Sequence, residues 1–448
     1  MKAIMKWIGE RYPLDETWKA HASEYYAPKN FNFWYYFGSL AMLVLVIQLV
    51  TGIFLTMHYK PDANLAFASV EYIMRDVNWG WLIRYMHSTG ASLFFVVVYL
   101  HMFRGILYGS HRRPRELVWL IGMFIYLSLM AEAFFGYLLP WGQMSFWGAQ
   151  VIISLFDAIP LIGPQLALWI RGDYVVSDVT LNRFFAFHVI LFPLILIGLV
   201  FAHIVALHKV GSNNPDGIEI KNNKDERGIP VDGIPFHPYY TVKDSAGAIV
   251  FLILFSLIVF FVPEMGGWFL ERDNFVPADP LRTPEHIAPL WYFTPFYAIL
   301  RATTDELKWV IGAGVAVFMV WAVLGGGAVF RRLILLAIGA VLLIGLYTLT
   351  AKVWGVMLMG AAVIILCFLP WLDKSPVKSV RYRGLLFKTA LALFVISFVG
   401  LGYLGTQQTT KAFTHMAQVL TVIYFGFFLL MPWYSTRDRT KSVPERIT

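Results

Sequence analysis

Long apolar stretches recur along the chain between residues 33 and 434, separated by shorter polar segments. Each is about 18 to 25 residues long, the length that a helix needs to cross a hydrocarbon core of about 30 Å. Because lipid offers no hydrogen-bond partner to an exposed backbone, every span is expected to be helical. Ten spans are predicted, at 33–57, 85–108, 117–138, 184–207, 245–263, 309–330, 333–350, 353–372, 386–405 and 416–434. The pattern therefore predicts an all-α, polytopic membrane protein.

Composition and charge agree with this class. Of the 448 residues, 58% are hydrophobic and 14% are charged, whereas a soluble domain carries about 25% charged residues. The net charge of +8 does not indicate nucleic acid, because 25 of the 36 Lys and Arg residues fall in segments predicted to lie on one side of the membrane. Positive residues collect on the cytoplasmic side. Both termini are therefore expected in the cytoplasm.

The chain is predicted to consist of four segments. These are a cytoplasmic amphipathic lead-in at 1–32, a four-helix bundle at 33–208 with an outer loop at 139–183, a cytoplasmic loop at 209–244, and a C-terminal helical domain at 245–448. The last segment contains an outer loop at 264–302 and an inserted helical hairpin at 303–350. The single cysteine, Cys367, excludes an internal disulfide and a covalently attached haem.

Four histidines lie inside two of these spans. His87 and His101 are 14 residues apart, about 21 Å and about 3.9 turns along a helix, so both rings leave nearly the same face. His188 and His203 repeat the arrangement 15 residues apart. One such histidine alone is more often a satisfied or interfacial residue, but ionisable groups at membrane depth are usually functional. Facing imidazole pairs predict two bis-imidazole sites, which suit haem iron in electron transfer.

Glycines repeat the same 14-residue spacing on the neighbouring spans. Gly38 and Gly52 are 14 residues apart, and so are Gly122 and Gly136. A flat macrocycle lying edge-on to a helix needs a position without a side chain. Ordinary small-residue helix packing is the alternative, but the shared pitch favours haem clearance. The sequence therefore predicts a dihaem four-helix bundle that holds two non-covalent b-type haems.

Three arginines lie near the histidines. Arg84 and Arg104 are each three residues from a histidine, toward the membrane faces, and Arg183 lies five residues before His188. A guanidinium can bind a carboxylate through two parallel hydrogen bonds, so these arginines are candidates for pairing with haem propionates. Contact with lipid headgroups is the alternative.

Five motifs stand at the ends of the spans and in the loops. They are Gly-Tyr-Leu-Leu-Pro-Trp-Gly-Gln-Met-Ser-Phe-Trp-Gly at 136–148, Arg-Phe-Phe-Ala-Phe-His at 183–188, Gly-Ser-Asn-Asn-Pro at 211–215, Pro-Phe-His-Pro-Tyr-Tyr at 235–240, and a motif at 289–301 made of Pro-Leu-Trp-Tyr at 289–292 and Pro-Phe-Tyr-Ala-Ile-Leu-Arg at 295–301. Together they make the chain resemble bacterial cytochrome b of ubiquinol–cytochrome c reductase, the respiratory complex III. The resemblance covers about 31–302 and 352–434.

The resemblance implies an activity. The family oxidises ubiquinol at an outer site and gives one electron to a Rieske iron–sulfur protein. The other electron passes through a low-potential and then a high-potential haem to a quinone at an inner site, which contributes to proton-motive force. By resemblance, His87 and His188 hold the low-potential haem, and His101 and His203 hold the high-potential haem. A cytochrome c1-type subunit, lipid contact and a dimeric complex in the bacterial inner membrane are also implied.

The resemblance also assigns two quinone sites. The outer site is implied at Phe134, Tyr137, Gly148, Pro289, Leu290, Tyr292 and Tyr297. The inner site is implied at His208, Ser212, Lys243 and Asp244. Taken alone, Lys243 and Asp244 are more often loop charges. As part of a titratable set at the inner border, they can hydrogen-bond a quinone and deliver protons.

One departure from the family concerns the outer site. The family commonly has Pro-Glu-Trp-Tyr, whose glutamate is proposed to accept a quinol proton, and Leu290 stands at that position here. No acid–base role is therefore expected of Leu290. His286, Glu285 or a chain of water molecules is the expected alternative route.

Two further departures concern helices. The 15-residue spacing from His188 to His203 is one longer than is usual in respiratory members, and Pro193 lies between them. A wide turn, either a proline kink or a π-bulge, is therefore predicted near Phe192 and Pro193. The hairpin at 303–350 is the other departure, and contact with lipid or a partner subunit is favoured over chemistry.

Two other classes of protein are possible. Another quinone-linked dihaem anchor, such as the membrane subunit of a formate dehydrogenase or hydrogenase, has fewer spans and one quinone site. A secondary transporter shows inverted repeats and helices broken at the membrane midplane, and neither pattern is found. The paired motifs at 136–148 and 289–301 favour cytochrome b over both.

Overall fold

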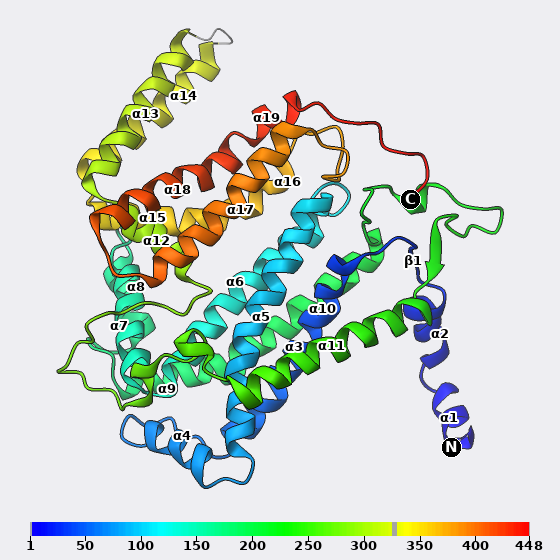
Figure 1. Ribbon diagram of the computed structural model, residues 1–448, viewed down its shortest axis with the longest axis horizontal. Helices are drawn as coiled ribbons and strands as arrows, with labels where there is room; N and C mark the ends of the chain where they lie inside the picture. Colours follow the sequence, from blue (N-terminus) through cyan, green and yellow to red (C-terminus); the bar gives the residue numbers. More distant parts are fainter. Residues whose placement is uncertain (1, 325–328, 448) are drawn as a thin grey trace.

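The computed structural model describes residues 2–324 and 329–447, and it is mostly helical (Figure 1). The helices of the first half are α1 (Lys2–Gly9), α2 (Leu14–Trp18), α3 (Tyr36–Thr56), α4 (Ala66–Arg75), α5 (Gly80–Tyr108), α6 (Glu116–Leu138), α7 (Gln143–Asp157), α8 (Gly163–Arg171), α9 (Asp178–Ala186) and α10 (Phe192–Val210). Those of the second half are α11 (Tyr239–Phe261), α12 (Thr294–Ala302), α13 (Asp305–Leu324), α14 (Val329–Thr348), α15 (Ala351–Ile364), α16 (Leu369–Leu372), α17 (Leu385–Thr406), α18 (Lys411–Leu429) and α19 (Met431–Arg437).

Eight helices of the described chain are long and apolar enough to cross a membrane. They are α3, α5, α6, the continuous α9–α10 helix, α11, the α15–α16 helix, α17 and α18. The other two predicted spans, 309–330 and 333–350, correspond to α13 and α14, which pack against each other. This hairpin projects away from the other helices (Figure 1). Its turn at 325–328 lies outside the described residues.

The four helices that carry the histidines and the paired glycines pack as two pairs. Helix α3 lies along α5, and α6 lies along α10. Helix α11 covers both α3 and α5. Val44, Phe95 and Tyr126 are almost fully buried within this group, as expected where apolar side chains interdigitate. The bundle therefore has a packed middle, with space left toward its two ends.

The C-terminal helices form a second group. Helix α12 packs against α15, α17 and α18, and α17 packs along α18. The contact between α17 and the start of α12 is so close that a Cβ atom at Gly405 would overlap the backbone of Thr294. This close approach fixes the start of α12, which follows the segment with Pro289 and Leu290, against α17.

The helix that ends in α10 contains a wide turn. A π-helical segment, Phe187–Leu191, joins α9 to α10, and the backbone N–H of Phe192 bonds to the carbonyl of Phe187. The predicted wide turn near Phe192 and Pro193 is thus confirmed. A π turn accommodates one residue more than an α turn, so it absorbs the extra residue between His188 and His203.

A small sheet joins the two ends of the chain to the loop at 209–244. Strand β1 (Tyr26–Pro28) pairs antiparallel with β2 (Gly233–Pro235). Asp232, next to β2, accepts hydrogen bonds from Lys29 at 2.9 Å and from Arg446 at 2.8 Å. The N-terminal and C-terminal segments therefore meet at the same end of the molecule.

Candidate functional site

The first histidine pair lies toward the end of the bundle next to the loops 139–177 and 262–293. His87 on α5 and His188 on the π-helical segment have ring centroids 6.0 Å apart, with their planes at 88°. A metal–imidazole bond of about 2 Å on each side, added to the ring radii, places two centroids about 6 Å apart. Both rings line a cavity of ≈ 260 Å³. The geometry suits a metal centre between the two rings.

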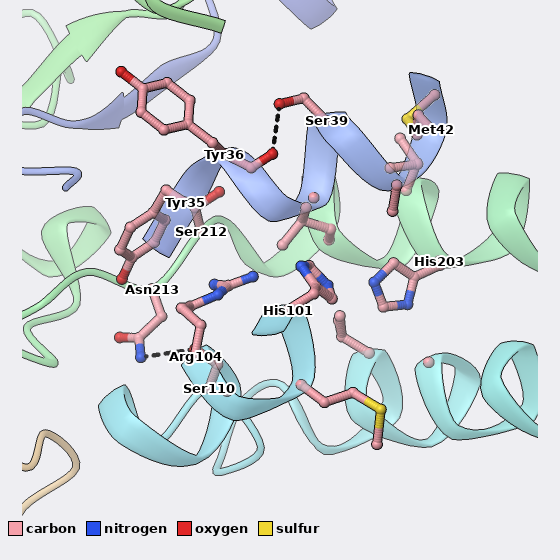
Figure 2. Close-up of a pocket in the computed structure, with 18 of the residues that line it drawn as sticks. Tyr35, Tyr36, Ser39, Met42, His101, Arg104, Ser110, His203, Ser212 and Asn213 are labelled. Atoms are coloured by element: carbon pink, nitrogen blue, oxygen red, sulfur yellow. Dashed lines mark hydrogen bonds between the residues drawn. The ribbon is translucent and has the colours of Figure 1, made fainter. Parts of the chain in front are cut away.

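The second pair repeats this geometry at the other end of the same helices. His101 on α5 and His203 on α10 have ring centroids 6.4 Å apart, and Figure 2 shows the two imidazoles side by side in the pocket. They line a cavity of ≈ 340 Å³. The structure therefore brings all four sequence-predicted histidines into two pairs, one in each cavity.

The four predicted glycines each lie against one of these imidazoles. A Cβ atom at Gly38 would come within 3.3 Å of His101, and one at Gly122 within 3.3 Å of His203. A Cβ atom at Gly52 would come within 3.4 Å of His87. Each glycine also lines the cavity of its histidine. A side chain at any of the four positions would fill space beside a histidine ring. Because these positions are glycines, each cavity has room for a flat macrocycle next to its histidine pair.

Hydrogen bonds with Thr51 and Glu132 orient the rings of His87 and His188. The Thr51 hydroxyl lies 2.9 Å from His87 Nδ1. Glu132 approaches His188 Nδ1 twice, with its carbonyl oxygen at 2.9 Å and its carboxylate Oε1 at 3.0 Å. Such partners fix the ring and leave Nε2 for a metal. Glu132 was missed by the sequence reasoning, although a carboxylate at membrane depth on α6 is itself a signal.

The three arginines separate into two groups. Arg84 lines the cavity of His87, and Arg104 lines the cavity of His101. The Nε atom of Arg104 is buried without a hydrogen-bond partner among the described residues, so this guanidinium has capacity for an anionic group. Arg183 instead donates to the backbone carbonyl of Trp169 and does not line either cavity.

The residues predicted for the outer quinone site converge on a small apolar pocket of ≈ 30 Å³ next to the outer histidine cavity. Six of the seven line it: Phe134, Tyr137, Gly148, Pro289, Leu290 and Tyr297. The seventh, Tyr292, lines the cavity of His87 and His188 instead and stacks on Phe95 with ring centroids 3.9 Å apart. Most ligand pockets for small apolar molecules combine such a lining with few polar groups.

Beside this pocket lies an acid that the sequence reasoning missed. The Tyr137 hydroxyl donates a hydrogen bond to the Glu271 carboxylate. Burial raises the pKa of Glu271 to about 7. The two groups suggested from the sequence lie elsewhere, since Glu285 is exposed and His286 lies 3.2 Å from the carbonyl oxygen of Thr406. Neither lines the pocket.

The residues predicted for the inner quinone site share the cavity of the inner histidine pair. His208, Ser212, Lys243 and Asp244 all line it. Tyr25 from the N-terminal segment joins them, stacking on His208 with centroids 4.5 Å apart and lying 3.4 Å from the Ser212 hydroxyl. The structure thus collects hydroxyl, imidazole, ammonium and carboxyl groups at one end of an apolar cavity.

Family comparisons agree with this geometry. The family described as cytochrome b/b6/petB matches residues 22–211, and the family described as cytochrome b (C-terminal)/b6/petD matches residues 277–326 and 330–425. Together the two matches span both histidine pairs and the residues predicted for the outer quinone site, while Ser212, Lys243 and Asp244 of the inner site lie between them.

Individual relatives are similar over nearly the whole chain. The chain is 59% identical to cytochrome b of Allochromatium vinosum, covering 99% of this chain and 98% of that protein. It is 44% identical to cytochrome b of Rhodospirillum rubrum, with 99% and 96% covered. Its fold matches a chain of a hyperthermophilic respiratory complex III with a TM-score of 0.80 and 36% identity, covering 96% of this chain and 98% of that one.

Proposed function

Because this chain belongs to the cytochrome b family, and is the redox subunit of a complex III-type quinol–cytochrome c oxidoreductase, we propose that it oxidises ubiquinol at one membrane face. One electron goes to a Rieske iron–sulfur protein, and the other crosses the membrane to a quinone at the opposite face. The observation that carries this proposal is the presence of two histidine-lined cavities at opposite ends of one bundle, one next to a small apolar pocket and the other with a group of polar side chains in its own lining.

The histidine pairs would hold two b-type haems. His87 and His188 would hold the low-potential one, and His101 and His203 the high-potential one. When bound, haems with two imidazole ligands supply one-electron transfer without an open coordination position. The 14 residues between His87 and His101 span about 21 Å of helix, so the two centres would bridge most of the hydrocarbon layer.

The outer pocket would bind the quinol ring among apolar side chains. Pro289 and Leu290 sit opposite Phe134, and Gly148 leaves room beside the Tyr137 ring. Tyr297 keeps its hydroxyl near the Ile287 carbonyl, 3.4 Å away. A pocket of this kind orients the ring and excludes water.

The inner pocket would bind a quinone and supply its protons. His208 and Ser212 are placed to hydrogen-bond a quinone oxygen, and Lys243 and Asp244 can carry protons from the adjacent solvent. Movement of one charge across the membrane is worth about 2.3 kcal/mol per 100 mV. Electron transfer to this face would therefore conserve energy as proton-motive force.

The proposed assembly is a dimeric complex with a Rieske protein and a cytochrome c1-type subunit in a bacterial inner membrane. Both termini would be cytoplasmic. Support comes from the positive charges of the segments next to the inner pocket and from the meeting of Lys29 and Arg446 at Asp232. The hairpin α13–α14 would contact lipid or a partner subunit.

A stepwise redox titration of the visible spectrum of the purified complex tests this function. The wild-type protein should show two b-type components, the higher-potential one shifted by an inner-site quinone analogue. His203→Leu should remove the higher component and keep the lower, which also shows that the variant folds. His415→Leu, at an exposed position outside both cavities, should keep both. A colourless wild-type protein, or two components in His203→Leu, would contradict the proposal.

A further inference from the structure

The outer quinone pocket lacks an acid or base in its own wall. Of the side chains that line it, only the hydroxyls of Tyr137 and Tyr297 are polar. Leu290 contributes an apolar side chain to this wall. Quinol oxidation releases protons as well as electrons, so a route for protons must begin at one of these two hydroxyls or at water.

Only one of the two hydroxyls is connected to a titratable side chain. Tyr297 lies near the backbone carbonyl of Ile287, at 3.4 Å. Tyr137 donates its hydrogen bond to the Glu271 carboxylate. The two residues are 134 positions apart in the chain and come from different elements, α6 and the segment between α11 and α12.

The loop that holds Glu271 is anchored firmly to the start of α7. The Asn274 backbone N–H lies 3.1 Å from the Glu271 carbonyl oxygen. The Asn274 side chain accepts from the Ser145 backbone N–H at 2.8 Å and donates to the Ser145 hydroxyl at 2.9 Å. A functional group supported in this way keeps a fixed position, so the contact of Glu271 with Tyr137 is built into the fold.

The groups that face Glu271 are few. They are Tyr137 from α6, Tyr292 from the segment before α12, and Asp273 from its own loop. Burial raises the pKa of Glu271 to about 7, and Asp273 adds to this effect while the Tyr137 hydrogen bond opposes it. Glu271 itself is half-buried, and the next two residues, Arg272 and Asp273, are exposed. Glu271 can therefore both accept and release a proton near neutral pH.

We propose, on the basis of the function proposed above, that Glu271 is the proton-relay residue of the outer site and acts through Tyr137. As one electron leaves the quinol for the Rieske iron–sulfur protein, the quinol O–H passes its proton to the Tyr137 oxygen. The O–H bond of Tyr137 breaks at the same time and its proton goes to the Glu271 carboxylate. Glu271 then releases this proton to the outer solution, so one proton enters and one leaves the relay.

The test is the pH profile of quinol oxidation by the intact complex, with a soluble ubiquinol analogue as donor and cytochrome c as acceptor. The wild-type rate should fall as the pH drops below about 7, because the protonated Glu271 cannot accept. E271Q should lower the rate by about 100-fold, the lower end of the range for a general base, and should remove this limb of the profile. E226Q, at an exposed position that lines none of the three cavities, is the matched control.

Two further variants separate a relay from a structural role. Y137F/E271Q should be no slower than Y137F alone, because two members of one route do not add. E271Q/L290E should recover a large part of the rate, because it returns a carboxylate to the pocket wall. The visible spectrum of each variant should retain both b-type components, which reports that the fold is kept.

Other results would contradict either the relay or the function on which it rests. An E271Q complex with the wild-type rate, or with a lower rate but an unchanged pH limb, would overturn the relay. Failure of the wild-type complex to oxidise quinol would instead contradict the function on which the relay rests.

Discussion

At the residue scale, the site depends on the absence of a side chain at the glycine beside each imidazole. The four cavity glycines approach the four histidines edge-on, and Gly136 is the closest of them to its partner, His188. Gly90 plays a related part, because a Cβ atom there would overlap the Gln48 amide, which bonds to the carbonyl of His87 at 3.0 Å. Glycine at these positions is a packing requirement rather than a source of flexibility.

Gly136→Ala should disturb only the outer centre. The new methyl group overlaps the His188 ring, and overpacking of this kind typically costs about 1–3 kcal/mol. The lower-potential component of the redox titration should fall below half of its wild-type amplitude, while the higher-potential component stays. Gly198→Ala, which meets no atom within 4 Å, should leave both unchanged. Full outer amplitude in Gly136→Ala would contradict this prediction.

At the element scale, one π turn reconciles an irregular spacing with a regular site. His87 and His101 are 14 residues apart on a continuous α-helix, while His188 and His203 are 15 apart. Without the π-helical segment Phe187–Leu191, the extra residue would rotate His203 by about 100° from the position that a 14-residue spacing gives. The two pairs instead have nearly equal centroid separations, 6.0 and 6.4 Å.

Deleting Ile190 should convert the π turn into a regular α turn and keep both haem components. Ile190 is an exposed residue of that turn, and its removal gives the second pair the 14-residue spacing of the first. Inserting one alanine after Ile197 should instead remove at least one component, since α10 has no second wide turn to absorb it. The amplitudes in the redox titration measure both. Loss of a component in the deletion variant would argue against this role for the π turn.

At the scale of the whole molecule, buried and half-buried polar contacts join the two groups of helices on the side of the inner cavity. Asp373, before α17, pairs with Arg383 at 2.5 Å and with His111, after α5, at 3.2 Å. Glu219 accepts from Arg115 at 2.6 Å and from Lys378 at 2.5 Å. These contacts place the end of α5 against the segment between α16 and α17.

Asp373→Asn should destabilise the whole protein. Removal of one partner from a buried ion pair costs about 3–5 kcal/mol, so the thermal unfolding midpoint at neutral pH should fall clearly, followed by loss of haem absorbance. Asp305→Asn removes a surface pair whose carboxylate is 80% exposed, a contact worth about 0–1 kcal/mol, and should have little effect. Equal midpoints for the two variants would contradict the prediction.

The lowered pKa of Asp373 also predicts how the thermal unfolding midpoint changes with pH. Burial alone would raise the pKa of Asp373, but the hydrogen bond of His111 and the charge of Arg383 outweigh it and hold the pKa below its usual value of 3.8. A group whose pKa is lower in the folded state than in the unfolded state stabilises the fold, and its full contribution is present at pH values above its unfolded pKa. The wild-type midpoint should therefore lose this contribution only as the pH falls below about 4, and Asp373→Asn should lack that part of the acid dependence.

The sequence by itself determined the features that repeat along a single helix. Apolar length predicted the membrane class and ten spans, eight of which are helices long and apolar enough to cross a membrane in the described chain. The histidine and glycine pitch identified residues that do lie together, because a helix converts sequence spacing into a face and a distance. The extra residue before Pro193 predicted a wide turn for the same reason.

Tertiary structure alone decided which side chains meet across elements. Glu271 reaches Tyr137 over 134 positions, Tyr25 reaches Ser212 over 187, and no periodicity links them. It also turned Arg183 to the Trp169 carbonyl rather than to a cavity. Such contacts depend on how helices and loops pack, which local spacing does not encode. The histidine pairs were accessible from the sequence, whereas the proton route beside them required the fold.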